Sequence, residues 1–455
     1  MERKKINPVT NIVNKHITVS VPGSKSITNR AMLLATMAKG ESRLNGALFS
    51  EDSRYFLKCL QDLGFETVVE ESECRISVIG QGGTVPKKEA SIYVGSAGTA
   101  ARFLAAYLCC QEGNYLMDAS EQMRKRPMVP LIRSLTSVGA VIGCPEEMGK
   151  FPMELMGKGI SRHDITVNID KSSQFLSALL ISGCLSKEDL HIHIEGKHGM
   201  SYVQMTINMM NRFGVRVEQV SDSEFVIPAG QQYEPQEYDI EPDASAAAYF
   251  WAMAAMLGIS VTVENIHFDS LQGDVAFVRI LEQMGCQVED TEVGITVTGP
   301  PEGHLKGIEV NMRECSDQAI TLAAIAPFAD SPVHITGILH IRAQESDRIA
   351  SIADNLLDMG VYVEEEADGV TIFPYGTRAY RGIEIKDSIE KLNAAHKKRL
   401  VKTFDDHRVA MGFALTGLKM PGVAILNPMC CKKTFENYFE VFDRAVAQIQ
   451  GDLTD

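Results

Sequence analysis

The chain has 455 residues, of which 45% are hydrophobic and 23% are charged, and its formal net charge at pH 7 is −15. This length exceeds one ordinary core and favours two domains or a repeated unit. The acidic balance argues against a general nucleic-acid surface or an anionic membrane partner, so any anion site must be local. Ten scattered cysteines without a C-x-x-C pair predict reduced thiols in a cytoplasmic protein, without a metal site or disulfide scaffold.

The first informative segment is Pro22 to Arg30, which follows a strand-like run at 17–21 and precedes an apolar helical run at 31–37. Helix N-termini attract anions, so Lys25, Ser24, Ser26 and Arg30 are predicted to form an anion cradle. A nucleotide-binding P-loop is disfavoured because Thr18 stands where that motif requires a glycine. An ordinary strand-to-helix turn with a solvated lysine remains the alternative.

A repeat of about 75 residues governs the expected fold. Helical runs end in glycine before a strand-like alternation at five places, Gly64, Gly139, Gly214, Gly285 and Gly360, at intervals of 75, 75, 71 and 75 residues. Glycine after a helix is the usual left-handed C-cap, and β-branched residues beyond it favour a strand. The spacing therefore predicts tandem units of alternating helices and strands.

Each period also has room for a second helix. These helices are expected at 100–110, 174–184, 244–256, 318–329 and 409–418, each after a small, polar or charged N-cap, Asp243 and Asp317 among them. The uncharged run 244–261 is interpreted as a buried helix, not a membrane span. The 71-residue interval between Gly214 and Gly285 contains the polar segment 231–243, which we interpret as a domain boundary. We therefore expect an α/β fold of two lobes with three repeats each.

Five polar clusters recur at strand-to-helix junctions and could meet at one site. They are Gly95–Thr99, Arg124–Pro127, Ser172–Gln174, Gln344–Arg348 and Asp405–Arg408. Taken singly, each has an ordinary structural explanation: the serines as helix caps, the arginines as a solvated face, and the Asp–Arg neighbours as weak surface ion pairs.

The joint pattern resembles the enolpyruvyl transferase family from about Val21 to Phe439. The matching motifs are PGSKSITNR (22–30), GSAGTAARFLAA (95–106), MRKRPM (123–128), SSQFLSALL (172–180), EPDASAAAYF (241–250), ESDRI (345–349), FDDHRVAM (404–411) and KTFENYFE (433–440). The resemblance implies two lobes of three βαβαββ units, 22–241 and 1–21 plus 242–455, with a cleft between them. It also implies transfer of the carboxyvinyl group of phosphoenolpyruvate to the 5-hydroxyl of shikimate 3-phosphate, with release of phosphate.

The resemblance further implies the residues of the site. Those matching the phosphoenolpyruvate set are Lys25, Gly98, Arg126, Gln174, Arg348, Arg408 and Lys433. Those matching the acceptor set are Lys25, Ser26, Arg30, Ser172, Ser173, Gln174, Tyr202, Asp317 and Gln344. Asp317 is the candidate base on the acceptor hydroxyl, Glu345 and Lys25 are candidates for proton transfer at the methylene carbon, and His407 is a weaker one. No metal or organic cofactor is required, and a monomer that closes around small anionic substrates by hinging near Val21 and Glu241 is expected.

Four positions depart from the family pattern: Ser96, Gly199, His340 and Gln344. Because the latter three lie on the acceptor side, an enolpyruvyl transferase with a different hydroxylated acid as acceptor remains an alternative, and Arg342, Lys197 or His340 could restore the missing contacts. The sister enzyme acting on UDP-N-acetylglucosamine is disfavoured, because no cysteine lies between Asn114 and Arg126. A binding protein without turnover is disfavoured by the presence of Asp317 and Glu345. The resemblance also implies sensitivity to glyphosate.

Overall fold

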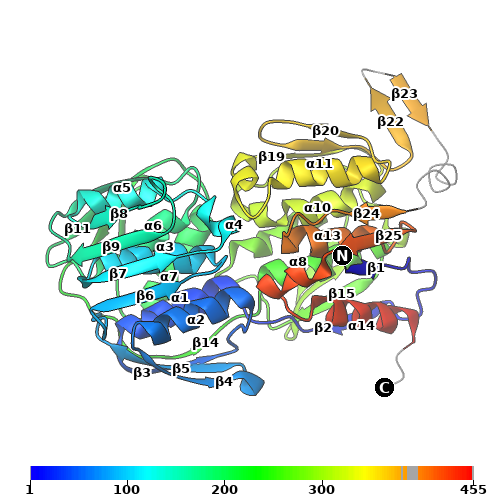
Figure 1. Cartoon of the computed structure of the whole chain (residues 1–455). Helices are drawn as coiled ribbons and strands as arrows, with labels where there is room; N and C mark the ends of the chain where they lie inside the picture. The colour runs from blue at the N-terminus through cyan, green and yellow to red at the C-terminus, as the bar shows by residue number, and fades with distance from the viewer. Residues whose placement is uncertain (1, 381–382, 387–397, 453–455) are drawn as a thin grey trace. The chain divides into compact units, whose positions relative to one another are not determined.

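The computed structural model describes residues 2–380, 383–386 and 398–452. The chain divides into two compact units: unit 1 comprises residues 1–22 and 242–455, and unit 2 comprises residues 23–241. Each unit is built from the same alternation of strands and helices (Figure 1). The α/β class expected from the sequence is confirmed.

Unit 2 contains three four-stranded sheets, ordered β14-β3-β5-β4, β6-β7-β9-β8 and β10-β11-β13-β12. In each sheet the first pair of strands is parallel and the others are antiparallel. The elements are α1 Lys25–Met37, β3 Lys39–Asn45, α2 Glu51–Asp62, β4 Glu66–Glu70, β5 Arg75–Gln81, β6 Glu89–Tyr93, α3 Gly98–Cys109, β7 Glu112–Asp118, α4 Glu121–Arg124, α5 Val129–Ser137, β8 Val141–Gly143, β9 Met153–Lys158, β10 Asp164–Asn168, α6 Gln174–Gly183, β11 Leu190–Glu195, α7 Met200–Arg212, β12 Glu218–Ser221, β13 Glu224–Ile227 and β14 Glu237–Asp239.

Unit 1 repeats the plan with sheets β16-β17-β15-β2, β18-β19-β21-β20 and β1-β25-β24. Its elements are β1 Arg3–Lys5, β2 His16–Val19, α8 Ala244–Leu257, β15 Ser260–Glu264, η2 Gly273–Ala276, α9 Phe277–Gln283, β16 Gln287–Asp290, β17 Gly294–Thr298, β18 Glu309–Asn311, η4 Arg313–Gln318, α10 Ala319–Ile325, β19 Val333–Thr336, η6 Leu339–Ala343, α11 Arg348–Asp358, β20 Val363–Glu365, β21 Val370–Ile372, β22 Thr377–Tyr380, β23 Ile383–Lys386, β24 Arg399–Val401, α13 His407–Thr416, β25 Val423–Leu426, η7 Pro428–Lys433 and α14 Tyr438–Gln450.

The first helix of each repeat is buried and forms the core of its unit. In unit 2, every residue of α3 is buried, and α3 packs against α1 and α6. In unit 1, α8, α10 and α13 pack against one another. Most residues of these helices are buried, as expected for helices enclosed by sheets and neighbouring helices. The N-termini of these inner helices carry most of the predicted site residues.

The glycine repeat has the predicted conformational cause. Gly64, Gly139, Gly214, Gly285 and Gly360 all have positive φ, between 84° and 110°. Each follows a helix and precedes a strand-like segment, where a side chain would strain the left-handed backbone. The 75-residue period is therefore the spacing of one helix-ending turn in five successive repeats.

The N-terminal segment completes a sheet of unit 1. β2 pairs in parallel with β15, so that Ile17 lies opposite Val261. This confirms that the residues before Gly23 join the later part of the chain. In unit 2 the corresponding place beside β3 is taken by β14, which arrives from the end of that unit's sequence.

The uncharged run near residue 244 forms α8, whose 14 residues are almost entirely buried. Asp243 is its N-cap and accepts a hydrogen bond from the backbone N–H of Ala246 at 3.0 Å, as predicted. Within the described ranges, no helix is long and apolar enough to cross a membrane. The interpretation as a buried helix is confirmed for 244–257, whereas residues 260 and 261 at the end of the run begin β15.

Candidate active site

In unit 2 the starts of α1, α3 and α6 are tied together by polar side chains. Asn29 of α1 donates to the Thr99 hydroxyl of α3 at 2.6 Å. Arg102 of α3 donates to the side-chain oxygen of Gln174 at 3.0 Å and to the carbonyl of Gly98 at 3.1 Å. These bonds hold the N-termini of the three helices next to one another. Each N-terminus favours anions through its unpaired backbone N–H groups and its helix dipole.

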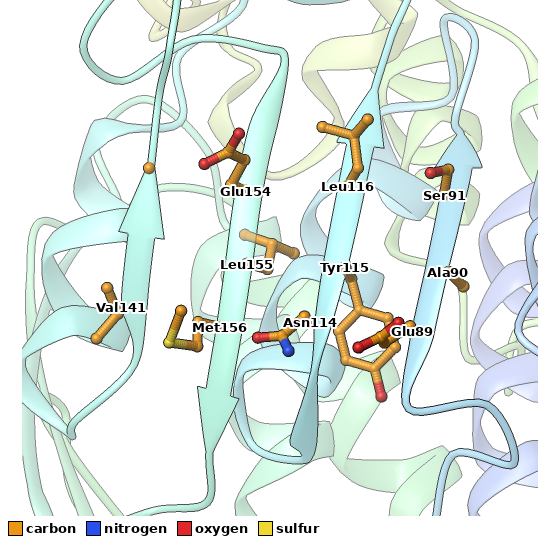
Figure 2. A pocket seen from close by; sticks show the side chains of 11 residues that line it. Glu89, Ala90, Ser91, Asn114, Tyr115, Leu116, Val141, Glu154, Leu155 and Met156 are labelled. Carbon is orange, nitrogen blue, oxygen red and sulfur yellow. The ribbon is translucent and has the colours of Figure 1, made fainter.

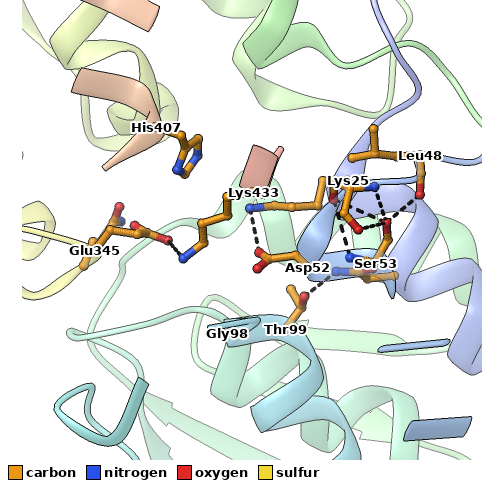
Figure 3. Close-up of polar contacts among 12 residues, drawn as sticks. Lys25, Leu48, Asp52, Ser53, Gly98, Thr99, Glu345, His407 and Lys433 are labelled. Atoms are coloured by element: carbon orange, nitrogen blue, oxygen red, sulfur yellow. Dashed lines mark hydrogen bonds and ion pairs between the residues drawn. The ribbon is translucent and has the colours of Figure 1, made fainter. Parts of the chain in front are cut away.

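Lys25 is the first residue of α1, directly after the N-cap Ser24. Its ammonium lies 3.4 Å from a carboxylate oxygen of Asp52, a residue of α2 whose side chain is only 3% exposed (Figure 3). An ion pair with a buried partner restricts the direction of a long side chain. Lys25 is therefore a held cation, and the solvated-lysine alternative is wrong.

Arg30 lies one turn further along α1 and is fully buried. Its guanidinium donates to the Thr206 hydroxyl at 2.8 Å and to the carbonyls of Ser26 at 2.9 Å and Tyr202 at 3.3 Å. Burial lowers its pKa to about 10, which leaves it charged at neutral pH. Arg30 thus connects α1 to the first turns of α7, where Tyr202 is half-buried.

Gly98 begins α3 and is closely approached by two guanidinium groups. A Cβ built there would lie 2.6 Å from Arg102 Nη1 and 2.7 Å from Arg126 Nη1. Only glycine therefore lets both cations remain beside the backbone at this helix start. Ser96 precedes this turn and shares a 2.8 Å hydrogen bond with Ser120.

Ser172, Ser173 and Gln174 lie at the start of α6. The Ser172 hydroxyl accepts from the backbone N–H of Gln174 at 3.3 Å, whereas the N-cap Ser173 makes no side-chain capping bond. Gly199, the N-cap of α7, has φ 63°, and a Cβ there would lie 2.8 Å from the Ser173 hydroxyl. The glycine at this departure from the family pattern therefore keeps the backbone of α7 close to Ser173.

In unit 1, Arg348 is the first residue of α11 and contacts four polar side chains. Its side chain is 2% exposed and binds both oxygens of Asp406 at 2.8 and 3.3 Å. It also donates to Glu345 at 2.8 Å, to Asp317 at 3.0 Å and to the side-chain oxygen of Gln344. Burial alone would lower the pKa of Arg348, but the charges of Asp406, Glu345 and Asp317 outweigh it and raise the pKa. The expected surface ion pair is wrong for Arg348, which is a buried network centre.

Asp317 bridges two arginines. One carboxylate oxygen accepts from Arg348 at 3.0 Å and the other from Arg408 at 2.6 Å. The side chain of Asp317 is 21% exposed. The prediction that Asp317 caps the following helix is wrong, because the 3-10 turn η4 runs through it and the N-cap of α10 is Gln318. Its carboxylate consequently faces the arginines and solvent instead of the helix backbone.

Lys433 ends η7, and its ammonium lies 3.3 Å from Glu345 (Figure 3). Glu345 therefore lies between Lys433 and Arg348. Asn427, the N-cap of η7, donates to the Asp405 side chain at 3.0 Å, which connects η7 to the turn before α13. Phe404 and Asp405 both have positive φ, at 52° and 58°. Such strained backbone persists where surrounding contacts fix it, as at many functional sites.

Asp406 confirms its predicted role as the N-cap of α13 and accepts from the backbone N–H of Arg408 at 2.9 Å. His407 is 1% exposed, and its Nδ1 lies 3.7 Å from Asp406. Its imidazole is therefore buried beside Asp406.

His340 in η6 and Gln344 directly after it depart from the family pattern, and both have defined partners. His340 Nε2 lies 2.8 Å from the hydroxyl of Ser316, the residue that directly precedes Asp317. The side-chain oxygen of Gln344 accepts from Arg348. Arg342 binds Asp347 at 2.8 Å and Glu365 at 2.8 Å. Arg342 therefore connects η6 to β20 through ion pairs with carboxylates. His340 contacts Ser316, the neighbour of Asp317, and Gln344 contacts Arg348.

Sequence reasoning missed Asp52, Arg102 and Asp274 as supports of the site. Arg102 lies within the motif GSAGTAARFLAA, and its charge inside an otherwise apolar helical run is the signal that could have identified it. Asp274 has no comparable motif. Its 3% exposure and its bond from Gln318 at 3.1 Å are visible only in three dimensions.

A pocket of about 690 Å³ lies on the exposed face of sheet β6-β7-β9-β8 (Figure 2). Leu116, Val141 and Met156 contribute apolar surface there, and Glu89 and Glu154 contribute carboxylates. None of the predicted site residues lines it. Among the residues that the structure describes, no group of His, Cys, Asp or Glu is arranged to hold a metal ion.

Comparison with known proteins agrees with this architecture. A model of the family described as EPSP synthase (3-phosphoshikimate 1-carboxyvinyltransferase) matches residues 9–442. Proteins named 3-phosphoshikimate 1-carboxyvinyltransferase are similar over most of the chain: 41% identity in Nostoc punctiforme, with 95% of this chain and 96% of the relative covered, and 36% in Vibrio campbellii, with 97% and 98% covered. The chloroplastic protein of Arabidopsis thaliana is 38% identical, with 94% and 82% covered.

The fold is also similar to that of solved structures. EPSP synthase from Acinetobacter baumannii superposes with a TM-score of 0.77 at 24% identity, over 98% of both chains. This likeness supports the arrangement of helices and sheets within an enolpyruvyl transferase fold. Together with the family match over residues 9–442, it agrees with the resemblance carried by the eight motifs. The chain belongs to the EPSP synthase (3-phosphoshikimate 1-carboxyvinyltransferase) family.

Proposed function

We propose that the protein transfers the carboxyvinyl group of phosphoenolpyruvate to the 5-hydroxyl of shikimate 3-phosphate and releases phosphate. The acceptor oxygen bonds to the central carbon of phosphoenolpyruvate while the methylene carbon gains a proton. The resulting methyl group then loses a proton as the carbon–oxygen bond to phosphate breaks, which restores the double bond. This sequence needs fixed cations for both anionic substrates and at least one base and one acid.

We propose that phosphoenolpyruvate is bound by Arg348, Arg408 and Lys433 of unit 1 and by Lys25, Arg126, Gln174 and the backbone at Gly98 of unit 2. Arginine suits this role because its planar fork matches carboxylate and phosphate oxygens. The contacts of Arg348 support the proposal, since its four anionic or amide partners fix its direction. A fixed guanidinium binds a substrate anion without further loss of side-chain entropy.

We propose that shikimate 3-phosphate is bound by Lys25, Ser26, Arg30, Ser172, Ser173, Gln174, Tyr202, Asp317 and Gln344. Asp317 would take the proton of the 5-hydroxyl. Glu345 and Lys25 would carry the proton to and from the methylene carbon, with Glu345 beside Lys433 at 3.3 Å. Glu345 also accepts from Arg348 at 2.8 Å, so it lies beside two of the cations that we assign to phosphoenolpyruvate.

The observation that carries the proposal is the double bridge of Asp317 to Arg348 and Arg408 at 3.0 and 2.6 Å. A partly exposed carboxylate thereby lies directly beside the two arginines that we assign to phosphoenolpyruvate. A base and an anion cradle in contact are what joining a hydroxyl to phosphoenolpyruvate requires. A binding protein without turnover has no need of that juxtaposition.

The test is phosphate release by the purified protein in four mixtures: each substrate alone, both together, and both with Asp317→Asn. Release that needs both substrates and falls at least about 100-fold in Asp317→Asn supports the proposal, because general base catalysis contributes about 10²- to 10⁴-fold. No release with both substrates would reject shikimate 3-phosphate as the acceptor. Phosphoenolpyruvate binding without such release would point to another hydroxylated acid.

We further propose that the protein works in the cytoplasm as a monomer with small anionic molecules, and not with nucleic acid. The net charge of −15 supports this, because it repels a polyanion while allowing a local cation cluster. Each of the ten cysteines is unpaired with another cysteine, as in a reducing compartment. Light scattering of the purified protein at a mass above 50.0 kDa would contradict the monomer.

A further inference from the structure

Asp274 is a buried carboxylate behind the proposed base. It lies in η2 and is 3% exposed, and its carboxylate accepts from the side-chain N–H of Gln318 at 3.1 Å. The Gln318 side chain is itself fully buried, and its oxygen accepts from the Thr321 hydroxyl at 3.2 Å. The amide of Gln318 is thus oriented from both ends, with its N–H group directed at Asp274.

The hydrogen bond between Gln318 and Asp274 lies directly beside Asp317 in the chain. Gln318 directly follows Asp317, and Ser316 directly precedes it and contacts His340 at 2.8 Å. Asp317 therefore lies between two anchored neighbours. Within the same 3-10 segment, Cys315 has non-helical torsion angles, φ −131° and ψ 39°, so regular helix hydrogen bonds do not fix the turn by themselves.

We infer that Asp274 is a positioning residue, which holds Asp317 against Arg348 and Arg408 by anchoring Gln318. The inference rests on the proposed function of Asp317 as base. A carboxylate serves as the anchor because it accepts strongly in a buried setting, where an unpaired Gln318 N–H would be costly. Losing the anchor lets η4 shift, and a small misplacement of a catalytic group lowers the rate far more than it weakens substrate binding.

The test compares Asp274→Ala with Asp274→Asn in the full-length protein. Asparagine keeps an oxygen that can accept from Gln318, whereas alanine removes the acceptor. We expect kcat of phosphate release to fall about 10-fold or more in Asp274→Ala, with KM for both substrates within about 2-fold, and to stay within about 3-fold of wild type in Asp274→Asn. Asp354→Ala removes an exposed carboxylate of α11 and is the matched control with unchanged kcat.

Amide hydrogen exchange provides a readout that does not depend on turnover. Exchange in residues 313–318 should rise about 10-fold in Asp274→Ala and match wild type in Asp274→Asn. Unchanged exchange and kcat in a folded Asp274→Ala protein would overturn the inference. If that variant does not fold, Gln318→Leu decides: it removes the same bond, and a wild-type kcat would overturn the inference. Wild-type protein without turnover would instead reject the proposed function, and the role of Asp317 with it.

Discussion

Arg348 and Asp406 form a two-bond pair in which the Nε of the arginine lies 2.8 Å from one carboxylate oxygen and Nη2 lies 3.3 Å from the other. Both side chains are buried, and Asp406 also caps α13. One carboxylate therefore fixes an arginine of α11 and starts the helix that carries Arg408. This connection makes the direction of two cations dependent on a single residue.

The Arg348 to Lys substitution tests this pairing. Lysine keeps the charge but cannot make two parallel bonds to Asp406 while also reaching Glu345 and Asp317. We expect kcat/KM for phosphoenolpyruvate to fall about 10- to 100-fold, since a hydrogen bond to a charged group contributes about 1.5–3 kcal/mol. Steady-state phosphate release measures it, and Arg279→Lys on the exposed face of α9 is the control. Equal values for wild type and Arg348→Lys would contradict the assigned role.

Gly98→Ala tests the close approach at α3. The new Cβ would lie within 3 Å of Arg102 and Arg126, so both guanidinium groups must move away. We expect KM for phosphoenolpyruvate to rise about 10-fold, while KM for the acceptor changes by less than about 2-fold. The same crowding should reduce inhibition by glyphosate, measured as a higher inhibitory concentration. A rise in the acceptor KM alone would place Gly98 elsewhere in the site.

Arg102→Met tests a residue that no sequence pattern had assigned. It removes the donor to Gln174 and leaves that partly buried amide oxygen less well paired, so kcat/KM should fall about 10-fold. The matched control is Arg399→Met in unit 1, because Arg399 is equally buried but bonds Pro421 and Tyr375. Thermal unfolding should show lowered stability for both variants. Loss of kcat/KM in both to the same extent would mean that burial, and not the Gln174 contact, matters.

The pH dependence of stability follows from Asp274. Burial, followed by the charge of Asp317, raises its pKa to about 6, against a small opposing effect of Arg408. The carboxyl group of Asp274 therefore stays protonated in the folded protein up to about pH 6, whereas in the unfolded chain it loses its proton above about pH 4. The free energy of unfolding consequently falls as the pH rises from about 4 to 6, by at most ~3 kcal/mol. The Asp274→Asn variant has no carboxyl group at this position, so its free energy of unfolding should not show this fall. Its stability relative to wild type should increase between pH 4 and pH 7, in urea unfolding at each pH, and a constant difference would contradict the assignment.

Local sequence patterns predicted the parts of the fold that local physics determines. The five glycines required positive φ, and Asp243 and Asp406 capped helices, because these features depend on a few neighbouring residues. The cap expected at Asp317 failed because η4 continues through that residue, and two distant arginines attract its carboxylate. The family resemblance proposed the residues of the site, but not their supports. Asp52, Arg102 and Asp274 act through partners far away in sequence, which no local pattern contains.

The proposed function requires the carboxyvinyl group to move intact to the acceptor. Its most direct test is NMR of a reaction of ¹³C-labelled phosphoenolpyruvate with shikimate 3-phosphate and purified protein. We expect the label to appear in a vinyl ether of shikimate 3-phosphate, in amounts equal to the phosphate released. Label that accumulates as pyruvate, or that stays in phosphoenolpyruvate while both substrates are present, would contradict it.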